Sequence, residues 1–458
     1  MSKKVGLTAI VFALLFSICW QTTAQEISEK KELSVFKLSY YDQEIPDSAL
    51  GSIDEEIKGV FINLRRFDVI GMAYRLSDND VSEFIDKVKE FKGENVEIPE
   101  KFQMGHEVFT EKDMNKLIGS FYVVVPAVTH FSVVKKERKL TGGGTKISYD
   151  SELKTSFTIV DVQAAKSLAQ FFVETEGSSD ESPDRAAQSA IDGIPMQLEF
   201  EVKKVPEFTL KTAVLERRGP EVVTELGQNM GILPGDEYML LTGQVLDSGR
   251  AFETETGLIV IKEVGEDVSL ATVLYGEPEE GDQLKEVPRL GFESTPYFNI
   301  LINPFDQFRL NFVAGLRMSL TKGLYTFRPI AGFEFPLPIG TTNTILPWLW
   351  IAGFPFNIYL GGEVAFYLGR LQIFPQAAVG AGFLVPWLAS IAQQFVVSHI
   401  GGYANLNINY LITRDIKLTL DLGYKHWISI WDVAVNAVTG STASYGGFMI
   451  VGGVTIKF

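Results

Sequence analysis

The chain is almost free of cysteine, since Cys19 is the single one among 458 residues. It lies in an N-terminal segment, residues 1–24, in which two lysines precede an apolar run that leads to a small-residue site at Ala24. This pattern is typical of a secretory signal peptide. Ile18 precedes Cys19 where a lipoprotein would need a small residue, so lipidation is disfavoured. The exported chain would then hold no thiol, which excludes disulfides, cysteine nucleophiles and thiolate metal sites.

An excess of basic residues is also missing. The chain carries 41 Lys and Arg against 57 Asp and Glu, a formal net charge of −16. From Gly291 onward nine Lys and Arg stand against seven Asp and Glu, so the negative excess lies upstream of that residue. Nucleic-acid binding needs a basic surface that neutralises phosphates. We therefore expect no nucleic-acid partner.

No apolar run is long and unbroken enough for a membrane-spanning helix, which needs about 20 residues. Residues 345–361 and 377–392 are the most apolar stretches, and Pro347 and Pro386 are among the prolines and glycines that interrupt them. A helical membrane protein is therefore a weak alternative. A soluble β-sandwich is weaker still, because one face of the C-terminal strands is uniformly apolar and aromatic.

The last fourteen residues, 445–458, alternate in polarity with a period of two, which predicts a β-strand with two different faces. One face carries Phe448, Ile450, Val454, Ile456 and Phe458. An alternating final strand that ends in phenylalanine resembles the sorting signal of bacterial outer-membrane β-barrel proteins. The resemblance implies that these five residues form an insertion signal, read by the barrel insertion machinery.

Residues 290–458 contain six further alternating segments and a shorter one at Tyr297–Ile302, which makes eight strands. Apolar residues outward and polar residues inward predict an antiparallel transmembrane barrel, and single-chain bacterial barrels have even strand numbers. Residues 320–323, 368–370 and 412–415 then form short periplasmic turns, and the longest connections lie outside.

The inward faces carry charges of both signs, which we expect to form a polar network in the lumen. An eight-stranded barrel leaves an interior about wide enough for side chains to fill. Buried charges must pair, so a closed polar plug is the favoured interpretation and a narrow ion path is the alternative. The predicted network consists of Arg309, Arg317, Arg328, Glu334, Glu363, Lys417, Asp421, Lys425 and Lys457.

Residues 25–205 mix helical and strand patterns. Thr110, followed by Asp113, suits a helix capping box, and Ser182 before a proline suits a helix start. We expect an acidic, serine-rich linker at residues 174–181.

The order of a helix, the strand Arg66-Phe67-Asp68-Val69-Ile70, a strand within residues 119–129 and the strand Thr158-Ile159-Val160-Asp161 is similar to the periplasmic fold shared by the CsgG, TolB amino-terminal and FlgT families. Those families usually place a pair of small residues after the final Asp, and Val162-Gln163-Ala164-Ala165 matches this only in part. The resemblance implies an α+β domain.

Residues 206–289 read as short strands joined by turns. Gly235-Asp236 and Gly281-Asp282 suit turns that need a left-handed residue. Together with the alternating run at residues 257–264, this pattern looks like the SH3-like module at the carboxy-terminal end of FlgT. In such families the module serves as a scaffold or docking unit, with no known catalytic set.

Few residues of the sequence are candidates for a catalytic site. Ser398-His399 and His426 fall near the predicted outer rim, where lipid-modifying barrel enzymes place His and Ser, but they lack the expected partner arrangement, so we read them as interface residues. The tryptophans at outer strand ends suit the headgroup layer: Trp348, Trp350, Trp387, Trp427 and Trp431. We expect no enzyme, and no catalytic, cofactor or metal site.

The sequence thus predicts a periplasmic α+β domain, an SH3-like β module and an all-β, eight-stranded antiparallel barrel in the outer membrane. We expect a non-catalytic anchor that holds a scaffold or docking module for envelope or appendage assembly. The alternatives are a small channel or secretion component and a lipid-modifying enzyme. The expected partners are outer-membrane lipids, the barrel insertion machinery and a periplasmic protein.

Overall fold

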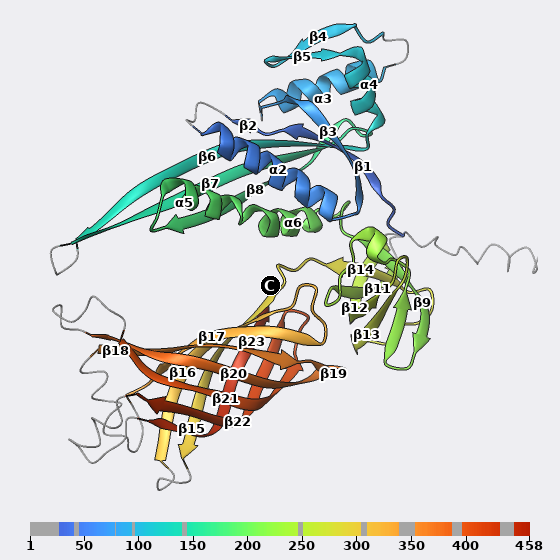
Figure 1. The fold of residues 1–458 in the computed structure, drawn as a ribbon. Coiled ribbons are helices and arrows are strands. Elements are labelled where there is room, and N and C mark those ends of the chain that lie inside the picture. The colour runs from blue at the N-terminus through green and yellow to red at the C-terminus, as the bar shows by residue number, and fades with distance from the viewer. Residues whose placement is uncertain are drawn as a thin grey trace, which may run out of the picture.

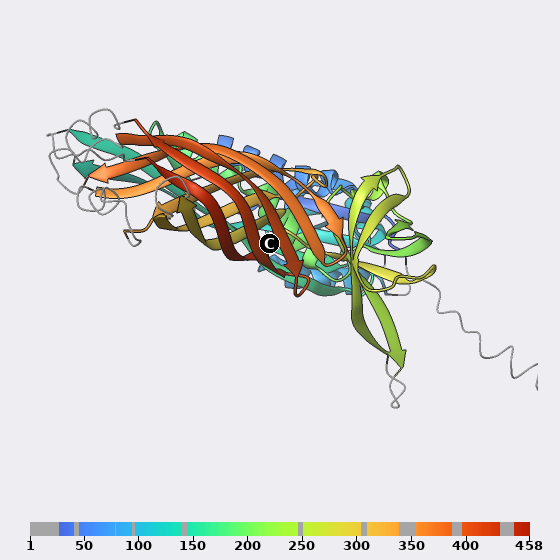
Figure 2. The ribbon, with the colours of Figure 1, turned by 90° about the horizontal axis from the view of Figure 1, so that it is seen from below.

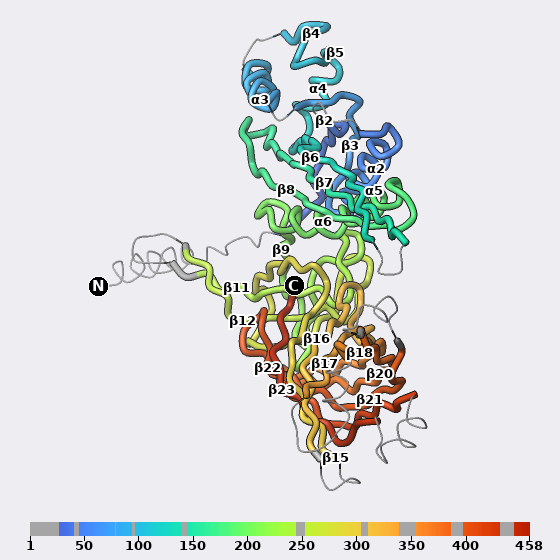
Figure 3. The backbone as a smooth tube through the Cα atoms, turned by 90° about the vertical axis from the view of Figure 1, so that its left-hand side faces the viewer, coloured from blue at the N-terminus to red at the C-terminus, as the bar shows by residue number. Residues whose placement is uncertain are grey.

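The computed structural model describes residues 27–40, 45–77, 79–93, 97–139, 144–245, 251–303, 309–338, 353–386, 396–430 and 444–458. These residues form an α+β domain, a small closed β-barrel and a larger C-terminal β-barrel (Figure 1). Figure 3 shows the small barrel between the other two parts. The predicted signal peptide, residues 1–24, lies outside the described residues.

The α+β domain is built on one sheet with strand order β3-β1-β6-β7-β8, in which β2 pairs with β6. β1 runs parallel to β3 and β6, whereas β6, β7 and β8 are antiparallel. Figures 1 and 2 show the β6–β7 hairpin extending in the same direction as the end of the large barrel that is far from the small one. The strands are β1 (Lys31–Lys37), β2 (Ser39–Tyr40), β3 (Phe67–Arg75), β6 (Tyr122–Lys139), β7 (Thr145–Asp161) and β8 (Lys166–Ser179).

Apolar side chains cover both faces of this sheet, because alternate residues of a buried strand point to opposite sides. Val124 packs with α2 (Asp47–Asn63), α5 (Pro183–Ile191) and α6 (Ile194–Lys204) on one face. Val123 and Val125 pack on the other face with α3, α4 and the β4–β5 hairpin. These four elements are α3 (Asp80–Phe91), β4 (Lys101–Met104), β5 (Glu107–Thr110) and α4 (Glu111–Gly119).

Both predicted helix caps are confirmed. The Thr110 side chain accepts a hydrogen bond from the backbone N–H of Asp113, and Ser182 accepts one from Arg185. The linker predicted at residues 174–181 is wrong, because β8 continues to Ser179. Glu174 and Glu176 belong to the solvent-facing half of an alternating strand, and Asp180 and Glu181 follow its end. The other half includes Gly177, where a Cβ would lie 2.2 Å from a backbone oxygen of α5, so glycine permits the helix to pack closely.

The small barrel closes in the order β10-β13-β12-β11-β14-β9. The glycines of both predicted Gly-Asp turns have left-handed backbones, with φ of +89° at Gly235 and +91° at Gly281. The barrel is closed as expected, and its SH3-like character rests on the resemblance alone. Its elements are β9 (Lys211–Arg218), β10 (Glu221–Thr224), η1 (Gln228–Met230), β11 (Glu237–Val245), β12 (Ala251–Val264), β13 (Ser269–Tyr275) and β14 (Gln283–Val287).

The large barrel is a closed ring of eight antiparallel strands, as predicted, because β18 pairs with β20 and β15 pairs with β23. The short β19 continues the path of β18 along β20. The strands are β15 (Phe292–Asn303), β16 (Arg309–Leu320), β17 (Phe327–Pro336), β18 (Gly353–Val364), β19 (Phe366–Leu368), β20 (Leu371–Pro386), β21 (Val396–Leu411), β22 (Ile416–Ser429) and β23 (Tyr445–Lys457).

The first strand of this barrel is longer than the predicted Tyr297–Ile302. It begins at Phe292, and Pro296 lies within it. Proline removes a ladder donor and weakens the strand signal, which explains the short prediction. Within the described residues, no helix is both long and apolar enough to cross a bilayer.

Candidate functional site

The structure places eight of the nine predicted lumen residues inside the large barrel. Each is at most 7% exposed: Arg317, Arg328, Glu334, Glu363, Lys417, Asp421, Lys425 and Lys457. The side chain of the ninth, Arg309, lies outside the described residues. Alternation explains the placement, because inward and outward positions of a barrel strand succeed one another.

The lumen half that lies far from the small barrel is held by one buried carboxylate. Glu334 is fully buried and pairs with Lys425. The Tyr297 hydroxyl donates a hydrogen bond of 2.6 Å to the same carboxylate and lies 3.2 Å from the Tyr359 hydroxyl. Aromatic and apolar side chains, including Trp427, fill the space around this pair.

The middle of the lumen is an ion pair extended by amide and hydroxyl groups. Arg317 lies 2.7 Å from Asp421 and also donates to the Gln376 side-chain oxygen at 2.8 Å. The Gln376 amide donates to Glu363 at 2.6 Å, and Ser319 donates to the same carboxylate at 2.7 Å. The charges are therefore compensated within the lumen, as a low-dielectric interior requires.

Near the small barrel, Glu293 compensates two cations. Lys417 donates to both of its oxygens, at 2.7 and 2.8 Å, and the Arg328 guanidinium lies 3.6 Å away. Sequence reasoning missed Glu293 because the predicted first strand began at Tyr297. Continuing the alternation backward by four residues would have placed Glu293 on the inner face.

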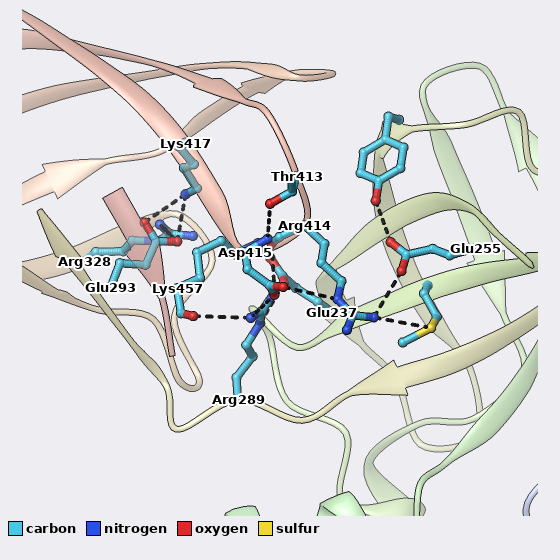
Figure 4. A network of polar contacts seen from close by, with 12 residues as sticks. Glu237, Glu255, Arg289, Glu293, Arg328, Thr413, Arg414, Asp415, Lys417 and Lys457 are labelled. Carbon is cyan, nitrogen blue, oxygen red and sulfur yellow. Dashed lines mark hydrogen bonds and ion pairs between the residues drawn. The ribbon is translucent and has the colours of Figure 1, made fainter. Parts of the chain in front are cut away.

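The small barrel supplies the last partner of the lumen. Glu237, on β11, pairs with Lys457, 220 positions later in the chain (Figure 4). Arg289, in the connection between the two barrels, bridges Glu237 at 3.0 Å and Asp415 at 2.6 Å. Among the side chains that the structure describes, and with Glu237 included, five lumen cations face five anions: Arg317, Arg328, Lys417, Lys425 and Lys457 against Glu237, Glu293, Glu334, Glu363 and Asp421. The charges of these ten residues therefore balance.

The turns of the large barrel also dock on the small one. Arg414 pairs with Glu255 at 3.0 Å, and the Arg370 guanidinium lies 4.0 Å from the centre of the Tyr275 ring. Leu411 is fully buried among apolar residues of the small barrel. At Gly235 a Cβ would lie 2.6 Å from the carbonyl oxygen of Thr321, so glycine allows the two backbones to approach.

At the end of the large barrel that contacts the small barrel, the electrostatics favour ionised side chains. Burial alone would raise the pKa of Glu237, but Lys457 and Arg289 together lower it below its usual range. The pKa of Asp415 is also lowered, since Arg289 and Arg414 outweigh its partial burial. The carboxylates therefore stay ionised, and the closure at this end is made of ion pairs.

A second buried ion pair joins the small barrel to the α+β domain. Arg66 donates two hydrogen bonds to Glu286, at 2.7 and 3.0 Å, and both residues are at most 3% exposed. Burial would raise the pKa of Glu286, but Arg66 and Lys203 lower it to about 2. The strand motif that begins at Arg66 signalled a β-strand, but nothing in it pointed to a partner 220 residues away.

The five residues of the predicted insertion signal lie on the outer face of the large barrel. Each is between 38% and 55% exposed: Phe448, Ile450, Val454, Ile456 and Phe458. The Phe458 ring stacks on Phe292 at 5.0 Å, and its N–H bonds the Phe292 carbonyl. Their role in sorting stays a prediction.

The tryptophans and histidines singled out in the sequence differ in where their side chains lie. Trp427 was predicted to lie in the headgroup girdle, and this is wrong, because its side chain is fully buried in the lumen. It shares the inner face with Lys425, so the alternation itself contained the answer. His399 is 2% exposed and bonds Ser398, whereas His426 is exposed on the outer face. Trp348, Trp350, Trp387 and Trp431 lie outside the described residues.

In the part of the chain that the structure describes, no group of three or more His, Cys, Asp or Glu side chains is arranged to hold a metal ion.

No family model and no curated protein sequence matches the chain. Similar solved structures include Neisserial surface protein A, with 12% identity, 37% of this chain and 97% of that one covered, and a TM-score of 0.25. A major outer membrane protein from Thermus thermophilus has 12% identity, coverage of 36% and 99%, and a TM-score of 0.21. A putative neuraminyllactose-binding hemagglutinin homolog from Helicobacter pylori has 11% identity, coverage of 39% and 91%, and a TM-score of 0.26. Likenesses with TM-scores this low say nothing about what the chain does.

Proposed function

We propose that the chain is a non-conducting outer-membrane anchor, which holds the small barrel and the α+β domain in the periplasm for envelope or appendage assembly. The observation that carries the proposal is the closed base, the end of the large barrel where Glu237 of the small barrel pairs with Lys457, next to a lumen whose described charges balance. A channel needs an open path. Here the charges neutralise one another, and a docked domain covers the mouth.

The outer wall supports the membrane part of the proposal. Outward-facing apolar residues such as Val379 and Leu360 are 73% and 64% exposed. Exposure of this apolar surface to water costs free energy, and contact with lipid removes that cost. Residues 25–289 then act as a scaffold or docking unit, as the resemblance to the CsgG, TolB and FlgT families implies. The turn at Thr413 lies beside the small barrel, so the proposal puts this end of the large barrel on the periplasmic side.

Planar-bilayer recording of the purified chain tests the closed lumen. We expect no conductance steps from the wild type. Steady steps at neutral pH would instead favour the alternative of a small channel or secretion component.

Membrane orientation is tested by labelling single cysteines in whole cells, since the exported chain has no cysteine of its own. Thr413→Cys should escape an impermeant maleimide, and Thr342→Cys, in a segment outside the described residues, should react. Equal labelling of both would reject the orientation.

We further propose that the barrel is not an enzyme. Ser398 and His399 share a 2.9 Å hydrogen bond, yet they are only 4% and 2% exposed, which keeps a lipid substrate away from both. Lipid A isolated from cells that express the chain should keep all its acyl chains. Loss of one acyl chain that depends on His399 would favour the enzyme.

A further inference from the structure

A groove of about 510 Å³ crosses the outer wall of the large barrel, over β18, β20, β21 and β22. Small outward-facing residues, Ala377, Gly402 and Ala404, lie along its floor. Leu360 and Val379, which protrude strongly, stand along one side. The volume lies within the range of small-molecule sites, about 300–1,000 Å³.

The opposite side of the groove carries the one imidazole on the outer face of β22. Tyr424 and His426 line the groove there, and both are exposed. The residues that directly face His426 on the adjacent strands are Gly402 and Gly446, which have no side chain to place over the imidazole. The ring stacks on Tyr424, with the centroids 6.4 Å apart. The other outward residues of β22 are apolar, except for Tyr424.

The position of His426 along its strand fits the headgroup layer. Ten residues separate it from Ile416, where β22 begins at the periplasmic turn. At about 3.3 Å a residue and a tilt of about 35–45°, this path rises roughly 23–27 Å along the barrel axis. Barrels of this kind have an apolar band about 25 Å tall, flanked by aromatic residues. Counted from Ile416, His426 therefore lies near the outer edge of such a band, with Tyr424 just inside it and Ile428 the next outward residue.

We infer that this groove holds one phosphate-bearing lipid of the outer leaflet, whose hydrocarbon chain lies on the small-residue floor. The imidazole N–H of His426 donates a hydrogen bond to a phosphate oxygen. The inference rests on the proposed membrane function and deepens it by naming the lipid class. A second copy of the barrel is the other conceivable occupant, but its largely apolar wall would leave a polar group at the headgroup level with few partners.

Native mass spectrometry of the full chain, released from detergent, tests the site with two probes: dipalmitoyl phosphatidylglycerol and dipalmitoylglycerol, which lacks the phosphate. Samples are first checked for a heat-modifiable gel shift. We expect one retained phosphatidylglycerol, bound about tenfold more tightly than dipalmitoylglycerol, because a hydrogen bond to a charged group is worth about this factor.

Two variants separate the two parts of the site. Ala404→Leu fills the floor and should abolish retention of both lipids. His426→Leu should keep a bound chain but lose the preference for phosphate. The matched control is Ala331→Leu, an exposed alanine on the outer face of β17 outside the groove, which should bind as the wild type does.

Retention of phosphatidylglycerol by Ala404→Leu at the wild-type level would overturn the inference. A lipid-free dimer that Ala404→Leu disrupts would also overturn it, in favour of a second copy. Both results leave the membrane proposal intact when the gel shift is present. Absence of the gel shift and of lipid binding in the wild type would reject the membrane proposal and the lipid site together.

Discussion

The closed base can be tested by removing the carboxylate that the small barrel contributes. In Glu237→Ala the Lys457 side chain, 4% exposed, loses its carboxylate partner. Arg289 keeps Asp415 but loses its second carboxylate. Breaking a buried pair by removing one partner costs about 3–5 kcal/mol. Because this penalty arises only when the two barrels are docked, it should destabilise the small barrel in the full chain.

The assay is urea unfolding of the full chain in detergent, followed by far-ultraviolet circular dichroism. Soluble domains of this size lose about 1–3 kcal/mol of stability per molar urea. A loss of about 3–5 kcal/mol should therefore lower the midpoint of the first transition by at least about 1 M. Glu216→Ala, which removes an exposed partner of Arg218 in the same domain, is the matched control and should leave the midpoint unchanged.

The double variant Glu237→Leu with Lys457→Met gives the second arm. An apolar pair of similar volume often replaces a buried ion pair at little cost, so this variant should recover most of the lost stability. A Glu237→Ala midpoint within about 0.3 M of the wild type would refute the reasoning, because it is far below the expected shift of at least about 1 M. A double variant less stable than Glu237→Ala would show that the pair does more than compensate charge.

Three further predictions concern other parts of the chain. Phe458→Asp should refold in detergent with a normal gel shift but fail to assemble in cells, and normal assembly seen by membrane fractionation would contradict the signal. Glu286 has a pKa lowered to about 2, so its contribution is complete above the pKa of an unfolded glutamate, about 4.3, and is lost as pH falls toward 2. The urea midpoint of the wild type should fall as the pH is lowered across that window, and the midpoint of Glu286→Gln should lack this part of the fall. Equal pH dependence of the two midpoints would contradict the prediction. The charged β6–β7 hairpin points along the large barrel (Figures 1 and 2), and lipid would exclude it. In nanodiscs a spin label at Ile147 should therefore be more accessible to water-soluble nickel than to oxygen dissolved in lipid, which requires the α+β domain to tilt away from the membrane. Greater accessibility to oxygen would contradict the proposed membrane placement.

The sequence determined the local features of this protein. Strand identity and the direction in which each side chain points follow from a period of two residues, which any short segment contains. The inward position of Lys417, Asp421 and Lys425 and the outward position of Phe458 could therefore be read from the chain. Helix starts at Thr110 and Ser182 were equally local, because a cap bonds within three residues.

Only the tertiary structure decided which groups meet. Glu237 and Lys457 are 220 positions apart, as are Arg66 and Glu286, and no period or spacing connects them. Such pairs form because each buried charge needs an opposite charge, and the fold decides which one lies near. Trp427 shows the boundary between the two: alternation placed it inward, but its residue type suggested the membrane surface. Packing in the lumen settled the matter, since an eight-stranded barrel has room inside for large side chains to fill.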